Sequence, residues 1–205
     1  LCPYCHNPGL VPGKAENTTR DADLETVMAF LEQRKGLVDG VVITGGEPTL
    51  QHGLPGFCRT VKSMGYRVKL DSNGSRPKII AALLDEGLID YVAMDIKTDL
   101  DHYQQLTAKG FDTSRIEESI HLIMDQAPAY EFRTTCSRPF VSAGILDNIG
   151  RLVAGASKYV LANCSRKVAV LNPEFVKSDD HFFSNAQIRA LGAVIEPYVE
   201  QTVIR

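Results

Sequence analysis

Two cysteines near the start of the chain form the pattern with the clearest chemical meaning. Cys2 and Cys5 are separated by Pro3 and Tyr4, so one turn of backbone can bring both thiols to the same side. Cysteines at this spacing serve as a redox dithiol, as half of a zinc site or as part of an iron–sulfur cluster. The spacing alone leaves these three kinds of site open.

The residues after Cys5 help to weigh these alternatives. The letters CPYC resemble the active site of glutaredoxins, where a helix follows the first cysteine and its amino end lowers the thiol pKa. Residues 6–13 instead contain two prolines and two glycines, which predicts a loop. A zinc site needs a second pair of ligands, and no other two cysteines lie close together in the sequence. His6 could be a third ligand, although its position next to Cys5 is awkward.

The other three cysteines support a different prediction. Cys58, Cys136 and Cys164 each stand in apolar or strand-like sequence, where a cysteine is most often a small buried hydrophobic side chain. Five cysteines are an odd number, and the first ten residues show no export signal. We therefore expect reduced thiols and a cytoplasmic location rather than a disulfide framework.

Length and composition are those of an ordinary globular protein. The chain has 205 residues, of which 44% are hydrophobic and 23% are charged, which excludes a disordered or low-complexity chain. The net charge of −3 gives no basic excess for binding nucleic acid or an anionic membrane. No apolar stretch approaches the roughly 18 residues of a membrane helix. No linker or repeat divides the sequence, so we expect one domain over residues 1–205.

A second candidate site follows the apolar segment at residues 41–44. Gly45 and Gly46 carry no Cβ, so they would let the backbone approach a bound ligand closely. Glu47 adds a carboxylate suited to an ammonium group. The alternative is a tight turn whose glutamate side chain is merely solvated.

Charged residues also stand near the ends of the following apolar segments. Asp71 and Asp95 lie beside apolar neighbours, where an aspartate is rare unless it is paired or binds a ligand. Lys97 follows Asp95 by two residues and would point to the same face of a strand. Arg133 lies within a strand-like segment and also needs a partner. A structural Asp–Lys pair is the alternative, but polar groups at one end of four successive segments favour a binding site.

Six short segments predict the strands that would position these residues. They are rich in β-branched and aromatic side chains, and several are apolar almost throughout, as expected for strands covered on both faces. These segments are residues 41–44, 67–71, 91–97, 130–136, 159–164 and 202–205.

Amphipathic stretches between these segments predict helices. Gly36 and Gly87 mark two helix ends, and capping-box patterns at residues 114–117 and 184–187 mark two starts. The expected helices cover residues 21–35, 77–86, a stretch from 114 onward, 146–156 and a stretch from 184 onward. Strands that alternate with helices predict right-handed crossovers and a mainly parallel α/β sheet, open or closed into a partial barrel. The chemistry should then lie at the carboxyl ends of the strands.

In combination, these motifs resemble those of the radical S-adenosylmethionine (SAM) enzymes. The sequence is most similar to the activating enzymes of glycyl radical enzymes, and among these to the activating proteins of anaerobic ribonucleoside-triphosphate reductase. The cysteine motif, GGEP and DIK occur here in the order and spacing of the family, over nearly the whole chain. The segments that carry the resemblance are residues 2–8, 43–50, 70–74, 94–97, 130–135 and 203–205.

The resemblance implies a fold and a metal site. The fold would be α/β, a partial (β/α)6-type radical SAM barrel of parallel strands whose first strand lies before Leu1. The family motif is Cys-x-x-x-Cys-x-x-Cys, and its thiolates hold a [4Fe–4S] cluster. Cys2 and Cys5 match the second and third cysteines, and the first would also lie before Leu1. Tyr4 and His6, within this loop, would contact the adenine of S-adenosylmethionine.

The resemblance also assigns roles to residues at the ends of the strands. Glu47 and the backbone of Gly45 and Gly46 would receive the methionine ammonium group of S-adenosylmethionine. The carboxylate and ribose of this cofactor would meet polar side chains after the next strands, and an arginine would contact cofactor or substrate. These side chains are Asp71, Ser72, Asp95, Lys97 and Arg133.

The implied reaction transfers a hydrogen atom from a partner protein. An electron from the cluster cleaves S-adenosylmethionine to methionine and a 5′-deoxyadenosyl radical, which abstracts hydrogen from a glycine Cα of a glycyl radical enzyme. A flavodoxin-like or other low-potential reductant would supply the electron, and neither nucleic acid nor membrane is expected as a partner. Pyruvate formate-lyase activators share these motifs, so the partner stays open. The further alternatives are a radical enzyme acting on a small molecule and, distantly, a thiol-disulfide oxidoreductase.

Overall fold

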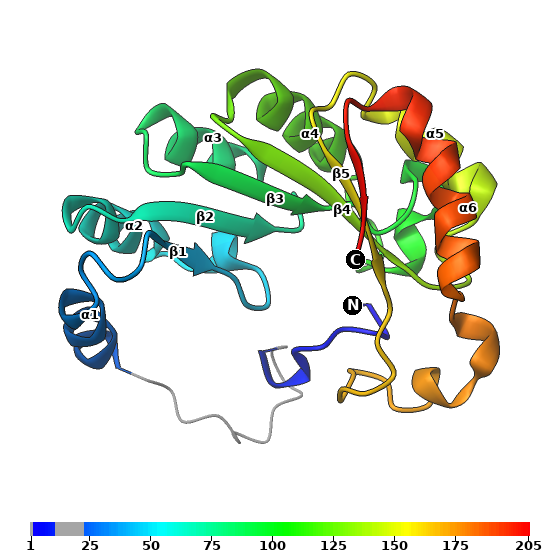
Figure 1. Ribbon diagram of the computed structural model, residues 1–205, viewed down its shortest axis with the longest axis horizontal. Helices are drawn as coiled ribbons and strands as arrows, with labels where there is room; N and C mark the ends of the chain where they lie inside the picture. Colours follow the sequence, from blue (N-terminus) through cyan, green and yellow to red (C-terminus); the bar gives the residue numbers. More distant parts are fainter. Residues whose placement is uncertain (1, 11–22) are drawn as a thin grey trace.

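Six parallel strands form one sheet in this computed structural model, which describes residues 2–10 and 23–205 (Figure 1). Neighbouring strands in the sheet are also consecutive in the sequence. The strands are β1 Gly40–Ile43, β2 Arg67–Ser72, β3 Tyr91–Asp95, β4 Tyr130–Cys136, β5 Tyr159–Asn163 and β6 Thr202–Ile204. All six predicted strands are confirmed to within two residues at each end, and their parallel pairing confirms the α/β class.

The described residues also form six α-helices. They are α1 Leu24–Gln33, α2 Leu54–Ser63, α3 Pro77–Asp85, α4 Ser114–Gln126, α5 Ala143–Leu152 and α6 Asn185–Ile195. In Figure 1, α2 to α6 lie along one side of the sheet, whereas the amino-terminal segment and the connection between β5 and α6 lie beyond its other side. None of the helices in the described ranges is long and apolar enough to cross a membrane.

One of the two predicted capping boxes is confirmed and the other is wrong. At the start of α6, Gln187 N donates to Ser184 Oγ, and Ser184 N donates to the Gln187 side chain. At the start of α4, the N-cap is Thr113 and no side chain caps the helix. Ser114 is the first residue of the helix rather than its N-cap, and its hydroxyl donates to Asp112 at 2.6 Å.

Three other helices differ from the prediction in extent or existence. α5 begins earlier than expected because the Ser142 hydroxyl caps its first turn, and it ends before residue 156. α1 is the described part of the helix predicted at residues 21–35, whose first two residues lie outside the described ranges. α2 is missing from the prediction because its start, Gly-Leu-Pro-Gly, has the composition of a loop.

The main hydrophobic core lies between the sheet and its helices. Val68 and Leu70 of β2 and Val92 and Met94 of β3 point into it and have no solvent exposure. The helices contribute a matching set of fully buried residues, which includes Ile80, Ile116, Ile120, Leu146 and Ile149. Burial of each such side chain stabilises the fold by about 1.5–3 kcal/mol.

The residues between these core positions point to the opposite side of the sheet, which we call the inner face. Along β2, buried and partly exposed side chains alternate as strand geometry requires. Charged and small side chains occupy the inner face: Lys69, Asp71, Ala93, Asp95, Glu131 and Arg133. This face therefore differs from that of a buried parallel sheet, which is apolar on both sides.

A second, smaller hydrophobic cluster holds the amino-terminal segment. The ring of Tyr4 lies 5.7 Å from that of Phe140 and 5.8 Å from that of Phe175. The buried members of this cluster are Tyr4, Leu106, Phe140, Cys164, Phe175 and Phe182. Cys58 and Cys136 are buried in the main core, so burial is confirmed for all three of the separate cysteines.

Gly150 allows α5 to pack against Tyr198. A Cβ at this position would lie 2.3 Å from the nearest ring atom, and the Tyr198 hydroxyl is held by a 2.6 Å hydrogen bond to Asp147. Because the ring must move, we expect Gly150→Ala to lower the free energy of unfolding by about 1–3 kcal/mol. Gly144→Ala, in the same helix with open space around the added methyl group, should stabilise the protein by about 0.5–1 kcal/mol. Urea unfolding measures both, and shifts of the same sign would contradict this packing.

Candidate functional site

Glu47 joins the ends of β1 and β2. Its side chain is nearly buried and accepts hydrogen bonds from Thr49 N (3.2 Å), Thr49 Oγ1 (2.6 Å), Ser72 Oγ (2.9 Å) and Asn73 N (2.7 Å). Three of these bonds end on Oε1 and one on Oε2, so Oε2 keeps an open acceptor position. The alternative of a merely solvated glutamate is therefore wrong.

The two glycines before Glu47 make room for the amino-terminal segment. A Cβ on Gly46 would lie 3.2 Å from the carbonyl oxygen of Leu10, and one on Gly45, whose φ is +149°, would lie 3.6 Å from Leu10 Cδ1. Asn7 Nδ2 also donates a 3.4 Å hydrogen bond to the carbonyl of Gly45. The neighbour that approaches these glycines is thus the chain itself, and their contact with an ammonium group stays a prediction.

Arg133 connects the carboxylates of two neighbouring strands. Its Nε donates to Asp95 Oδ1 at 2.8 Å, and its Nη1 donates to Asp71 Oδ2 at 3.0 Å. Lys97 Nζ donates to the other oxygen of Asp95 at 2.8 Å. The Asp–Lys pair considered as an alternative is thus present, and it belongs to a group of four charges on the inner face. The Lys97 side chain is 21% exposed, which leaves it accessible to a further partner.

Burial and ion pairing act in opposite directions on these charges. Burial alone would raise the pKa of Asp95, but the charges of Lys97 and Arg133 outweigh it and lower this pKa below its usual value. Burial would likewise lower the pKa of Lys97, but Asp95 and the nearby Cys2 raise it overall. Both shifts favour the charged forms of Asp95 and Lys97.

Cys2 and Cys5 lie on one turn next to this charged group. A 3.1 Å hydrogen bond from Cys5 N to Cys2 O closes the turn, and both thiols are partly exposed, unlike the three buried cysteines. Burial raises the pKa of Cys2, and the positive charge of Lys97 opposes this shift. A cation thus lies near a thiol that must become a thiolate to bind a metal.

Tyr4 and His6, on either side of Cys5, have different surroundings. Tyr4 is buried in the second hydrophobic cluster, and its hydroxyl has no hydrogen-bond partner among the described atoms. His6 is exposed. The structure thus places the Tyr4 side chain among aromatic residues and His6 in solvent, and a contact of either residue with adenine stays a prediction.

The residues present fit part of an iron–sulfur ligand set. Thiolates are the usual ligands of such clusters, and hydrogen bonds to the sulfur atoms tune their potential. Burial raises the pKa of Tyr4, and the nearby thiol of Cys2 raises it further. Within residues 2–10 and 23–205, no three His, Cys, Asp or Glu side chains gather as a metal site, so the two thiols would be the ligands that this part of the chain supplies.

The sequence patterns miss several side chains of this site. Tyr103 accepts a 3.1 Å hydrogen bond from Lys97 N. No sequence signal indicates this contact, because Tyr103 lies in the short 3-10 helix Leu100–Gln105. Glu131 is buried on the inner face, two residues before Arg133, and the strand alternation used for Asp95 would have found it. Three cations lie 3.1–3.6 Å from its carboxylate, namely Lys69, Lys158 and Arg205.

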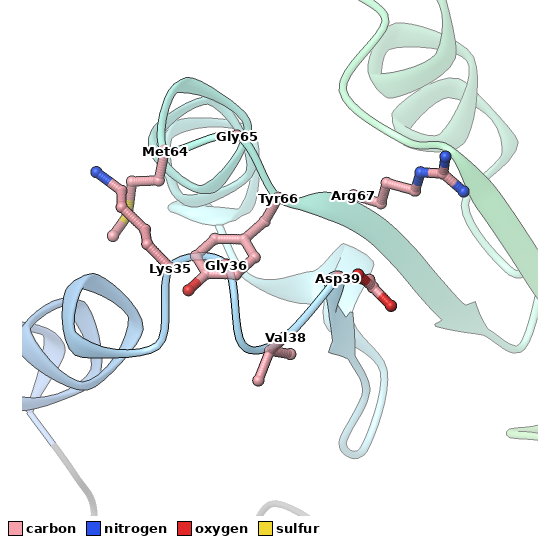
Figure 2. Close-up of a pocket in the computed structure, with 8 residues that line it drawn as sticks. All are labelled: Lys35, Gly36, Val38, Asp39, Met64, Gly65, Tyr66 and Arg67. Carbon is pink, nitrogen blue, oxygen red and sulfur yellow. The ribbon is translucent and has the colours of Figure 1, made fainter.

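A pocket of about 520 Å³ lies away from this site (Figure 2). Its lining residues are Lys35, Gly36, Val38, Asp39, Met64, Gly65, Tyr66 and Arg67. In Figure 2, the side chains of Asp39 and Arg67 point away from the ring of Tyr66. Arg67 begins β2, whereas Ser72 at the other end of that strand contacts Glu47, so the pocket and the charged group lie at opposite ends of the sheet.

The sequence matches known proteins. A family profile described as the Radical SAM superfamily matches residues 1–132. A protein of Methanocaldococcus jannaschii, provisionally named a glycyl-radical enzyme activating enzyme, is 30% identical over 209 residues, which cover 100% of this chain and 83% of that protein. A Pyrococcus abyssi protein with the provisional name GTP 3′,8-cyclase is 30% identical over 112 residues, which cover 54% of this chain and 35% of that protein.

Solved structures share the fold. A domain of a pyruvate-formate lyase-activating enzyme from Bacteroides vulgatus has a TM-score of 0.62 at 14% identity. The matched region covers 82% of this chain and 99% of that domain. Streptococcus suis SuiB bound to S-adenosylmethionine has a TM-score of 0.70 at 17% identity. The matched region covers 99% of this chain and 48% of the SuiB chain. These likenesses confirm the predicted fold class.

The ion pairs of Asp95 predict how stability depends on pH. Because its pKa is lowered in the folded protein, Asp95 stabilises the fold above the pKa of the unfolded chain, and this contribution is lost as pH falls through the folded value. We expect Asp95→Asn to lower the free energy of unfolding by about 1–2 kcal/mol at pH 7. The difference from the native protein should shrink below about pH 4.

Urea unfolding from pH 3.5 to 7 measures this difference. Asp125→Asn, at an exposed position on α4, serves as the control and should change stability by less than about 0.5 kcal/mol. An Asp95→Asn effect that stays constant over the whole pH range would contradict the ion pairing.

Proposed function

This chain belongs to the Radical SAM superfamily, and we propose that it activates a glycyl radical enzyme. The cofactors of the superfamily are a [4Fe–4S] cluster and S-adenosylmethionine. When bound, they supply the radical that removes a hydrogen atom from a glycine Cα of the protein substrate. In this proposal, the substrate is anaerobic ribonucleoside-triphosphate reductase.

The extent of the match to the M. jannaschii protein carries this proposal. That match covers the whole chain, whereas the family profile ends at residue 132, within β4. The similarity therefore continues through β5, α6 and β6, beyond the part recognised in the superfamily at large. It supports a common substrate class rather than common cofactor chemistry alone.

The amino-terminal half of the site would hold the cluster and the ammonium group of S-adenosylmethionine. Cys2 and Cys5 supply thiolates to the cluster. Glu47 is held rigidly by four hydrogen bonds and keeps an acceptor position on Oε2, which suits an ammonium group beside the backbone of Gly45 and Gly46. In this proposal, Tyr4 and His6 contact the adenine.

The charged group would hold the rest of S-adenosylmethionine. Lys97 offers a positive charge to its carboxylate, and Asp95 and Arg133 fix the position of Lys97. Asp71 Oδ1 accepts no hydrogen bond and lies 3.6 Å from Lys69 Nζ, and in this proposal a ribose hydroxyl donates to it. Ser72 acts through Glu47, to which its hydroxyl donates.

The proposal extends to the surroundings of the enzyme. We place the protein in the cytoplasm as one domain over residues 1–205, where a flavodoxin-like or other low-potential reductant supplies the electron. The odd number of cysteines supports a reducing compartment rather than a disulfide framework.

Electron paramagnetic resonance tests the proposal. The anaerobically reconstituted holoenzyme, mixed with the reductase, S-adenosylmethionine and a strong reductant, should generate a glycyl radical signal. Lys97→Met should lower the radical yield about ten-fold or more, since a charged contact contributes roughly 1.5–3 kcal/mol. Arg59→Gln, which removes a surface ion pair to Glu86 on the helix side, is the matched control and should leave the yield unchanged.

Two alternative substrates serve as further arms of this experiment. A glycyl radical on pyruvate formate-lyase, with none on the reductase, would contradict the assigned partner. Turnover of GTP or another small molecule, with no radical on either protein, would contradict the activating function.

A further inference from the structure

A long connection, residues 164–184, joins β5 to α6 and lies against the cysteine turn, residues 2–5. Leu171 N donates a 3.0 Å hydrogen bond to the carbonyl of Cys5, and Asn172 N donates a 2.9 Å hydrogen bond to that of Pro3. The connection contains two short 3-10 helices, Phe175–Lys177 and Asp179–His181. Two backbone donors from the late part of the chain thus fix two carbonyls of the turn.

Side-chain packing adds to these hydrogen bonds. The connection contributes Phe175 and Phe182 to the cluster that buries Tyr4, the residue between the two cysteines. Phe175 contacts the Tyr4 ring and is itself stacked on His181, with ring centres 4.1 Å apart. The connection therefore packs against the ring of Tyr4.

The connection is in turn anchored to the end of β4. Arg138 N and Ser137 Oγ both donate to the carbonyl of His181 at 2.9 Å, and Arg138 Nη1 donates to that of Phe182 at 2.7 Å. The guanidinium of Arg138 also lies 3.9 Å from the centre of the Phe183 ring. This network gives the connection a fixed place relative to the sheet.

The cysteine turn has few other attachments within the described ranges. Its own hydrogen bond runs from Cys5 N to Cys2 O, and the next one in the segment runs from Leu10 N to Asn7 O. Apart from the connection, Tyr4 of the turn packs on Phe140, which follows β4, and Asn7, two residues after the turn, donates a 3.4 Å hydrogen bond to the carbonyl of Gly45. The turn contains no helix or strand of its own that could make it rigid.

We propose that the β5–α6 connection is the element that positions Cys2 and Cys5, with Phe175 and the amide of Leu171 as positioning residues. Ligands hold a metal group tightly only when surrounding contacts fix their direction and spacing. The inference rests on the proposed function in one respect, namely that these two thiols are metal ligands. The new element of the inference is that the positions of these two thiols depend on residues 164–184, far from them in the sequence.

Two variants weaken the attachment in different ways. Leu171→Pro removes the amide that donates to Cys5, and Phe175→Ala removes the ring that packs on Tyr4. Hydrogen exchange of residues 2–10 and the rates at which iodoacetamide alkylates Cys2 and Cys5 are measured on the full, reduced, metal-free chain. We expect the exchange rate and the alkylation rate each to rise about five-fold in Leu171→Pro, because one hydrogen bond is lost. In Phe175→Ala, each rate should rise about ten-fold or more.

Matched controls separate positioning from general destabilisation. Val168→Ala changes an exposed residue of the same connection and should leave both rates at the native value. Phe175→Leu restores an apolar side chain and should recover most of the protection. Exchange in β2, β3 and β4 should stay native in every variant, because their side chains pack in the separate main core.

Two outcomes would overturn the inference. Native exchange and alkylation of the cysteine turn in both Leu171→Pro and Phe175→Ala would show that the connection does not hold it. Faster exchange throughout β2 to β4 in both variants would show that the connection supports the whole fold instead. Because these measurements use the metal-free chain, they keep their meaning if no glycyl radical is found, so the two proposals fail separately.

Discussion

A positive charge between two carboxylates sets the arrangement of the inner face. Charged side chains on a sheet destabilise it unless each one finds a partner. Arg133 of β4 meets this requirement by binding Asp71 of β2 and Asp95 of β3. A slip of one residue in any of these strands would turn its charged side chain toward the apolar core, so the ion pairs and the register of three strands depend on one another.

The register of these strands also determines where the other side chains of the site lie. Lys97 reaches Asp95 because it continues the alternation of β3, and its charge in turn faces Cys2. Glu47 plays the corresponding part for β1, because it takes hydrogen bonds from the end of β2. The edge strand is thereby tied to the strand that carries Asp71, and the glycine-rich turn is brought to the same end of the sheet as the charged group.

Local patterns allowed prediction of the strands and of the charged positions, since apolar alternation and side-chain direction are properties of a few consecutive residues. The capping box predicted at Ser114 is absent for a local reason as well, because the helix begins one residue earlier, with Thr113 as its N-cap. The ion pair of Glu131 with Lys158 and the packing of Tyr4 against Phe175 join residues that are distant in sequence. No spacing rule reaches such pairs, so the surroundings of the cysteines emerge only from the fold.

The hydrogen bonds of Leu171 and Asn172 to the cysteine turn also determine when this turn can become ordered during folding. Contacts between the two ends of a sequence close a very large loop, and such contacts form late in folding. During synthesis the turn is made well before the segment that binds it, and folding proceeds from the amino-terminal side. The two hydrogen bonds that hold the cysteine turn can therefore form only after residues 171 and 172 have been synthesised.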